Sequence, residues 1–151
     1  MAKQTETGIP YGPCAFEALK LRVPGKARVE FPNGEFTPKL HNYLKKHLPR
    51  LDYLYCNYDG DSVWLQVEGV DQEREGLGIA GVVIYDELRQ IGWCYENPKY
   101  QGDETDVEAG GGWIPKWGVC DGPEVLLTII ETFLTTGKPW EGCPWRVNEG
   151  D

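Results

Sequence analysis

The sequence predicts one α+β domain, in which an antiparallel β-meander of about four to five strands packs against two amphipathic helices. Three observations lead to this fold class. Apolar residues recur at helical spacing in two segments, near residues 37–48 and 121–137. An Asp59-Gly60 pair separates two short runs of strand-like composition. The chain has 151 residues, the usual size of a domain with one core, so we expect residues 1–151 to form a single domain.

The first third of the chain is broken up by proline. Four prolines predict a loop-rich start with one short helix or strand, and we expect residues 1–13 to be flexible. The first helix then begins at Thr37-Pro38, an N-cap residue followed by proline at the first helical position. Its apolar stripe is formed by Leu40, Tyr43, Leu44, His47 and Leu48. Pro49 ends this helix.

The middle of the chain has the pattern of a β-meander. The Asp59-Gly60 pair supplies the positive φ angles of a type I′ turn, and apolar and polar residues alternate in the strand that follows it. A run of β-branched residues within 77–85 suits an inner strand, and Ile91 to Tyr95 is the fourth strand. The four expected strands are residues 53–58, 62–68, 77–85 and 91–95.

Residues 96–112 show no periodicity and predict the one long loop of the domain. They carry five acidic residues against Lys99 and end in three glycines. A loop of this length in a compact domain is usually functional or disordered. Residues 113–120 return to the domain as an edge strand or an extended lead-in.

A second helix follows, and its sequence signals are the clearest in the chain. Asp121 and Glu124 form a capping box, and Gly137 closes the helix. Its apolar stripe is Val125, Leu126, Ile129, Ile130, Phe133 and Leu134. We expect the tail from Pro139 to Trp145 to fold back over this helix, and residues 148–151 to fray.

Composition narrows the class of partner. The formal net charge is −9, which disfavours nucleic acid and membrane surfaces because both attract basic proteins. The five cysteines include no Cys-x-x-Cys, so free thiols in a reducing cytoplasm are expected, with no disulfide framework. No apolar run has the length of a signal peptide or a membrane span. The sequence therefore predicts a soluble cytoplasmic protein.

The sequence contains no recognisable catalytic or metal-binding pattern. The only two histidines, His41 and His47, lie on different sides of the first helix, so they cannot bind one metal together. Gly110 to Gly112 fits no phosphate-binding motif, and the spacing of an EF-hand is absent. We expect no enzyme activity, metal or cofactor. A carboxylate pair of the glycosidase type stays open as an alternative, because the fold sets its geometry.

Aromatic residues flank the acidic loop. Tryptophan and tyrosine dominate binding hot spots, and charges around them set orientation and association rate. Large aromatic residues also fill cores, which is the competing interpretation. The loop and its flanks give a candidate partner-binding set: Glu96, Tyr100, Asp103, Glu104, Asp106, Glu108, Trp113 and Trp117.

The C-terminal half carries a longer pattern of elements. A strand pair is followed by an aromatic strand, an acid- and glycine-bearing loop, a short segment with proline, and a helix that leads into a proline- and tryptophan-containing tail. Its parts are Val63 to Val67, Leu77 to Tyr85, Trp93 to Tyr95, Glu104 to Gly112, Ile114-Pro115, and Phe133-Leu134-Thr135-Thr136-Gly137-Lys138-Pro139 with Trp145. This pattern resembles the bacterial immunity proteins that protect cells against polymorphic toxins, many of which are nucleic-acid deaminases.

The resemblance implies a cytoplasmic inhibitor that binds a cognate toxin domain and covers its active site. Toxins that act on nucleic acid are commonly basic around the substrate groove, and an acidic loop can occupy such a groove. We expect a monomer or weak oligomer. The alternatives are a phage-encoded inhibitor of a host defence nuclease, which would share the acidity, and an enzyme acting on a small substrate.

Overall fold

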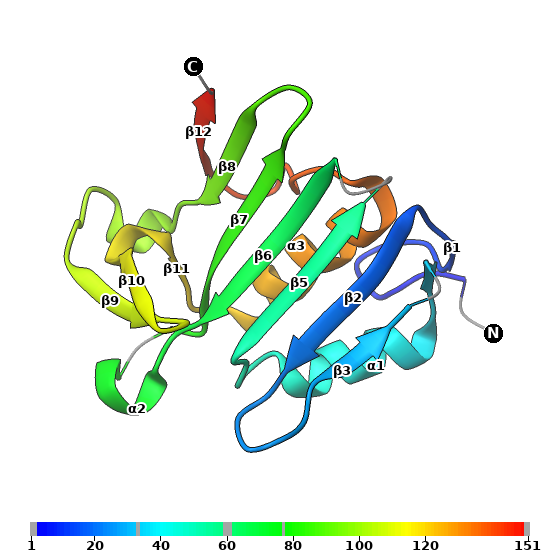
Figure 1. Ribbon diagram of the computed structural model, residues 1–151, viewed down its shortest axis with the longest axis horizontal. Coiled ribbons are helices and arrows are strands. Elements are labelled where there is room, and N and C mark those ends of the chain that lie inside the picture. Colours follow the sequence, from blue (N-terminus) through cyan, green and yellow to red (C-terminus); the bar gives the residue numbers. More distant parts are fainter. Residues whose placement is uncertain (1–2, 33, 59–61, 77, 150–151) are drawn as a thin grey trace.

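The protein is built around one antiparallel β-sheet with two helices on one of its faces (Figure 1). The computed structural model describes residues 3–32, 34–58, 62–76 and 78–149. Within these residues the sheet has eight strands. Their order is β12 (Trp145–Glu149), β8 (Ile91–Tyr95), β7 (Ala80–Asp86), β6 (Val63–Gly69), β5 (Tyr53–Tyr58), β2 (Phe16–Arg22) and β3 (Val29–Phe31), and β11 (Val119–Cys120) pairs with the start of β7.

The predicted α+β class, with a meander of four to five strands, is wrong: strands predominate, and the helices of the described residues are few and short. The four predicted strands are present as β5 to β8. The proline-rich first third adds β2 and β3, although it was expected to be mostly loop. The C-terminal tail adds β12, which pairs along all of β8, and Trp140 and Trp145 of this tail pack against the core. The edge strands β3 and β12 are short and carry few apolar residues, so their sequences give little strand signal, and the prolines around β2 hid its pattern.

Helices α1 (Pro38–His47) and α3 (Pro123–Thr136) lie behind the sheet in Figure 1. As predicted, Thr37 caps α1, and its hydroxyl accepts a hydrogen bond from the Leu40 amide at 3.1 Å. The capping box predicted for α3 is wrong, because Gly122 is the N-cap and no side chain caps the helix. The Asp121 carboxylate instead accepts a hydrogen bond from the Asn97 amide.

The core lies between the sheet and these two helices. Strand residues alternate, so that Leu54 and Leu65, for example, face the helices while their neighbours face outward. Ile130 and Phe133 of α3 are fully buried, as predicted. On the other face of the sheet, no helix of the described residues lies over the centre or over β2, as Figure 1 shows.

Small elements complete the chain. A two-stranded ribbon pairs β1 (Gly12–Pro13) with β4 (Glu35–Phe36), and a second pairs β9 (Asp106–Ala109) with β10 (Gly112–Pro115). The short helices are α2 (Gln72–Glu75), η1 (Pro98–Tyr100) and η2 (Lys116–Gly118). None of the helices in the described part of the chain has the length and apolar character that a membrane span requires.

Three further expectations concern the two termini and one turn. Residues 3–13, expected to be flexible, are tied back by the bond from the Tyr11 amide to the Lys3 carbonyl and by a bridge between Gln4 and Pro10. Asn148 and Glu149, expected to fray, belong to β12. The predicted turn at Asp59-Gly60 lies outside the described residues.

Candidate functional site

The expected long loop contains a β-hairpin. Strands β9 and β10 pair in register from Gly112–Ala109 to Pro115–Asp106, which places Glu108 directly across from Trp113. Gly110 and Gly111 form the turn with φ angles of 58° and 81°. The prediction of an aperiodic loop over residues 96–112 is therefore wrong. The two adjacent glycines at 110 and 111 supply the positive φ angles of a tight hairpin turn, a signal that the sequence prediction did not use.

A small core of its own holds the hairpin in place. Val107 and Ala109 of β9 are buried together with Val70 and Val119, and Ile114 packs against them. Val70 also forms a β-bridge with Ala109, and the Gly110 amide donates to the Gly69 carbonyl at 3.1 Å. The hairpin is thus fastened to the end of β6 and extends beside the sheet (Figure 1).

Most of the acids predicted to face a partner are paired within the chain. Glu96 lies 3.1 Å from Arg146, and Glu104 lies 3.7 Å from the same guanidinium. Asp103 lies 3.9 Å from Lys116. These contacts compensate much of the negative charge that the sequence assigned to the loop. The compensating Arg146 comes from β12, far along the chain, so its position could not be read from the local pattern.

The candidate aromatic residues differ in exposure. Trp117 is buried, and its indole N–H donates to Glu104 at 3.1 Å, so in this structure it belongs to the core and is not an accessible anchor. Tyr100 is half-buried, and the ammonium groups of Lys99 and Lys116 lie 5.3 and 4.9 Å from its ring. Trp113 is 59% exposed. Of the candidate aromatics, Trp113 is therefore the one presented to a partner.

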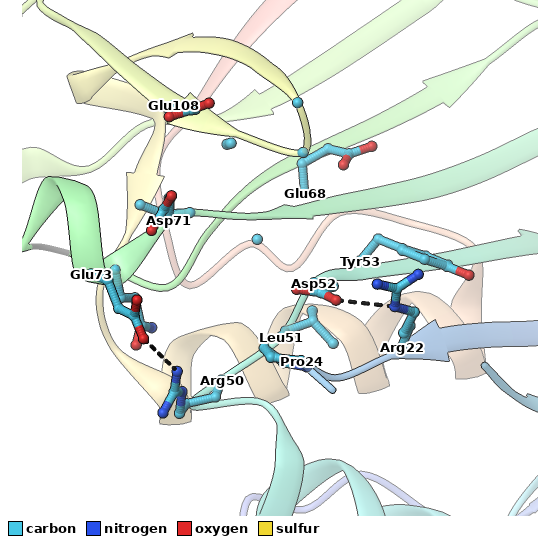
Figure 2. A pocket seen from close by; sticks show the side chains of 16 residues that line it. Arg22, Pro24, Arg50, Leu51, Asp52, Tyr53, Glu68, Asp71, Glu73 and Glu108 are labelled. Atoms are coloured by element: carbon cyan, nitrogen blue, oxygen red, sulfur yellow. Dashed lines mark ion pairs between the residues drawn. The ribbon is translucent and has the colours of Figure 1, made fainter. Parts of the chain in front are cut away.

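A cleft of about 620 Å³ opens between this hairpin, the ends of β5 and β6, and α2. In Figure 2, Arg22 and Arg50 lie in the lower part of the cleft, and Glu68, Asp71 and Glu108 lie above them. The cleft brings together segments that are distant in sequence. Its lining residues are Arg22, Pro24, Arg50, Leu51, Asp52, Tyr53, Glu68, Gly69, Val70, Asp71, Gln72, Glu73, Glu108, Ala109, Gly110 and Gly111.

The floor of the cleft depends on Gly69. A Cβ atom at this position would lie 1.7 Å from the carbonyl oxygen of Leu51, so no other residue fits without moving the backbone. The Gly69 amide donates to the Asp52 carbonyl at 2.7 Å, which ties the end of β6 to the segment before β5. This close approach leaves Glu68 and Asp71 on either side of the floor, where both line the cleft.

The cleft is acidic. Its lining includes five carboxylates and two guanidinium groups, a net charge of −3. Arg22 pairs with Asp52 at 3.1 Å, and Arg50 reaches Glu73 at 3.9 Å, as the dashed lines in Figure 2 show. Among the described residues, no cationic side chain pairs with Glu68 or Asp71. Glu68 accepts a hydrogen bond from Gln66, and Asp71 accepts one from the Arg74 amide at 3.1 Å.

Trp113 lies across the hairpin from Glu108, which lines this cleft. Glu108, its partner across the hairpin, lies 2.9 Å from Arg74, and the Arg74 guanidinium lies 5.8 Å from the Trp113 ring. The Glu108 amide also donates to the carboxylate of Glu75 at 2.6 Å. These contacts join the hairpin to α2 and keep Trp113 next to the acidic lining. The remaining candidate residue, Asp106, is exposed at the start of β9.

The chemistry of the cleft is that of cation recognition. Ionised carboxylates accept hydrogen bonds and attract ammonium and guanidinium groups. The described lining contains no histidine, cysteine or serine that would act as a nucleophile or as a general base at neutral pH. Across the described residues, no three or more His, Cys, Asp or Glu side chains are placed to hold a metal ion. The arrangement is suited to binding a basic side chain.

Sequence reasoning found part of this site. Glu108 and Trp113 were named, because they lie in one segment with acids and aromatics. Glu68, Asp71 and Gly69 were missed, because their role depends on the bridge between Val70 and Ala109, which joins segments that no local pattern connects. The Gly110-Gly111 pair was the one available signal, since it predicts a turn that could bring β9 and β10 together.

A second groove, of about 860 Å³, lies at the other end of the sheet beside the end of α3. Trp93, Trp140 and Trp145 contribute to its wall. Its charged residues are balanced, Asp86 and Glu141 against Arg89 and Lys138. This second groove therefore lacks the negative charge of the cleft beside the hairpin. We take the acidic cleft as the candidate functional site.

Comparison of the chain with protein-family models, with curated proteins and with solved structures gave no match.

Proposed function

We propose that this protein is an immunity protein that binds a cognate bacterial toxin domain, of the deaminase type that targets nucleic acids, and neutralises it by covering its active site. One observation carries the proposal: an exposed Trp113 lies across the hairpin from Glu108, which lines an acidic cleft in which Glu68 and Asp71 have no cationic partner among the described residues. The resemblance of the C-terminal half to immunity proteins supplies the class of partner.

Charge supports this choice of partner. A domain that acts on nucleic acid presents lysine and arginine around its substrate groove, because the substrate is a polyanion. A cleft with a net charge of −3 on a chain with a net charge of −9 attracts such a groove and speeds encounter. Glu68 and Asp71 can each accept a charge-assisted hydrogen bond from a lysine or arginine of the partner.

Trp113 supports a binding role independently of charge. An indole that is largely exposed at a hairpin edge gives up little internal packing when a partner covers it, and buried tryptophans contribute most strongly to interfaces. Its contact with Arg74 restricts its position before binding. The proposed contact surface therefore centres on Trp113 and the cleft. Glu96, Glu104 and Trp117 instead contact Arg146 and help to hold the segment that carries the hairpin.

The cellular setting follows from the same proposal. All five cysteines are free thiols, which suits the reducing cytoplasm in which an immunity protein must meet its toxin. We propose that the protein acts there as a monomer or weak oligomer, with no metal or cofactor, and that it binds neither nucleic acid nor membrane. An interface of ordinary size would cover about 800 Å² on each partner.

Co-expression tests the proposal. The toxin domain encoded by the neighbouring gene is expressed in a bacterial host with and without this chain, and growth is followed. The proposal predicts growth arrest by the domain alone and rescue by the chain. Rescue should weaken for the paired change Glu68→Gln and Asp71→Asn and persist for Glu124→Gln, an exposed glutamate on α3. Arrest that persists with the native chain, or inhibition of a host defence nuclease in its place, contradicts the proposal.

A further inference from the structure

A buried histidine lies between two carboxylates on the helix side of the molecule, away from the acidic cleft. Nδ1 of His41, in α1, is 2.6 Å from the Glu131 carboxylate of α3. Nε2 of the same ring is 3.1 Å from the carboxylate of Glu6, in the N-terminal segment. The partner Glu131 is too distant in sequence for any local pattern to connect the two.

The three groups differ sharply in burial. His41 is 4% exposed and Glu131 is fully buried, whereas the side chain of Glu6 is 68% exposed. Within the described residues, nothing lies at hydrogen-bonding distance from Oε1 of Glu131. An ionised carboxylate with one unpartnered oxygen is costly in such a place. Burial accordingly raises the pKa of Glu131 to about 7, and the hydrogen bond from His41 opposes that rise.

The two contacts of His41, with Glu6 and with Glu131, together require two protons. The pKa of Glu6 is lowered, first by a backbone hydrogen bond and then by Lys45, so Glu6 is a carboxylate that only accepts. Nε2 of His41 must therefore donate to it. A second proton is needed between Nδ1 and Glu131, because two acceptors do not approach to 2.6 Å. A neutral imidazole carries one N–H, so it cannot serve both carboxylates when both are ionised.

We propose that Glu6, His41 and Glu131 form a pH-dependent latch that holds the N-terminal segment, residues 3–13, against α1 and α3 while the extra proton is bound. When the proton leaves, the one remaining N–H stays with the buried Glu131, which has no other donor among the described residues. Nε2 then presents a lone pair to Glu6, and the exposed carboxylate of Glu6 moves away.

Other charged groups around the latch act in predictable directions. Lys45 of α1 lies 3.2 Å from Glu6 and holds it whether or not the shared proton is present. Tyr11 faces the ring of His41, with the ring centres 6.2 Å apart, and is neutral below its own pKa. Opening of the latch is therefore partial: Lys45 still attracts Glu6 after the shared proton has left.

Opening of the latch affects the part of the core that the N-terminal segment covers. Ile9 and Tyr11 pack on the core, and the Tyr11 ring lies 5.1 Å from that of Phe36. The Ile9 amide donates to the buried Thr5 hydroxyl at 3.1 Å. When Glu6 separates from His41, residues 4–11 lose this attachment to α1 and keep the one through Lys45, so this edge of the core becomes more accessible. The latch involves none of the residues of the acidic cleft, so it stands apart from the proposed function.

Hydrogen exchange of the full chain between pH 6 and 8 tests the latch. After correction for intrinsic exchange, the protection of the Tyr11 and Ile9 amides should fall as the pH rises, by up to about tenfold per pH unit for one released proton. In Glu131→Gln, the side-chain amide donates to Nδ1 and leaves an N–H on Nε2 for Glu6, so protection should no longer depend on pH.

Matched variants separate the latch from general loosening. Glu124→Gln, on the same helix but exposed, should behave as the native chain does. Glu6→Gln should lower the protection of these two amides at pH 6 and remove its pH dependence. The proposal is overturned if protection in the native chain is constant across this range, or if it falls equally in the native chain and in Glu131→Gln.

Discussion

The guanidinium carbon of Arg146 lies 3.7 Å from the centre of the Trp117 ring. The same side chain donates to Glu96 at 3.1 Å, so one residue of the edge strand β12 holds both ends of the segment that carries the hairpin. The stacking contributes to the burial of Trp117, and the same guanidinium pairs with Glu96 and Glu104. The proposed binding surface is therefore the hairpin with Trp113 and the cleft beside it.

Loss of Arg146 should loosen this support. We expect Arg146→Ala to lower the free energy of unfolding by about 1–2 kcal/mol, because the change removes both the stacking on Trp117 and the charge-assisted hydrogen bond to Glu96. Arg146→Lys should recover only part of this, since an ammonium cannot stack as a planar guanidinium does. Urea denaturation measures both. Arg28→Ala, at an exposed position, serves as the control, and equal stabilities of the Arg146 and Arg28 variants would show that the stacking contributes nothing.

The core contact between α3 and the sheet gives a second prediction. Phe133 is fully buried, and its ring centre lies 5.9 Å from that of Tyr58. Phe133→Ala should cost about 3–5 kcal/mol of unfolding free energy, because it removes a large apolar side chain and leaves a cavity. Leu88→Ala, where the side chain is 82% exposed, should change the stability little in the same urea titration. Similar losses for the two variants would contradict the packing described.

Gly69 gives a test of the floor of the cleft. Gly69→Ala should destabilise the protein by about 1–3 kcal/mol or more, because the new Cβ meets the Leu51 carbonyl and the backbone must shift. Gly112→Ala is the matched control, since the nearest atom to its Cβ would be 3.9 Å away. The melting temperatures of the two variants, measured by thermal unfolding, are compared with that of the native chain. If Gly69→Ala melts with the native chain, the close approach at the floor is not real.

The buried Glu131 predicts how stability depends on pH. Its pKa is raised from 4.5 to about 7 in the folded protein, first of all by burial. A raised pKa means that the folded state binds the proton more tightly, so this contribution is complete below 4.5 and is lost as the pH rises through about 7. The free energy of unfolding should thus decline from pH 6 to pH 8 in urea titrations. Glu131→Gln should flatten this decline, and an unchanged decline would assign it to other groups.

The sequence predicts those elements whose signals are local. The Thr37 cap, the stripe of α1, the stripe of α3 and the alternation in β6 each lie within one segment, and each element is present. The strands β2, β3 and β12 were not predictable, because they depend on partners: the edge strand β12, for example, is short, carries two charged residues and forms against β8. Pairing of this kind reflects tertiary contact more than intrinsic preference.

The candidate site was predictable only in part, for the same reason. Trp113 and Glu108 were named from an acidic, aromatic stretch, but that stretch does not show which members face inward. Trp117 is buried because Arg146, from another part of the chain, stacks on it. Glu68 lies in a strand whose alternation correctly marked it as outward-facing, yet only the hairpin above it makes that outward face a cleft.

Trp113 should act in binding and not in folding. Because it is 59% exposed, Trp113→Ala should leave the unfolding free energy within about 0.5 kcal/mol of the native value. If the proposed interface is correct, the same change should raise the dissociation rate from the toxin domain at least tenfold, as expected for an anchor covered by the partner. Surface plasmon resonance and urea denaturation give the two values. A loss of stability without faster dissociation would assign Trp113 to packing.

The association rate of the chain with the toxin domain, measured against salt concentration, tests whether the cleft recognises a basic groove through Glu68 and Asp71. The paired change Glu68→Gln and Asp71→Asn should slow association several-fold at low salt and flatten its salt dependence, while Glu124→Gln leaves both unchanged. Association of the paired variant at the native rate, with the native salt dependence, would contradict recognition through these two residues.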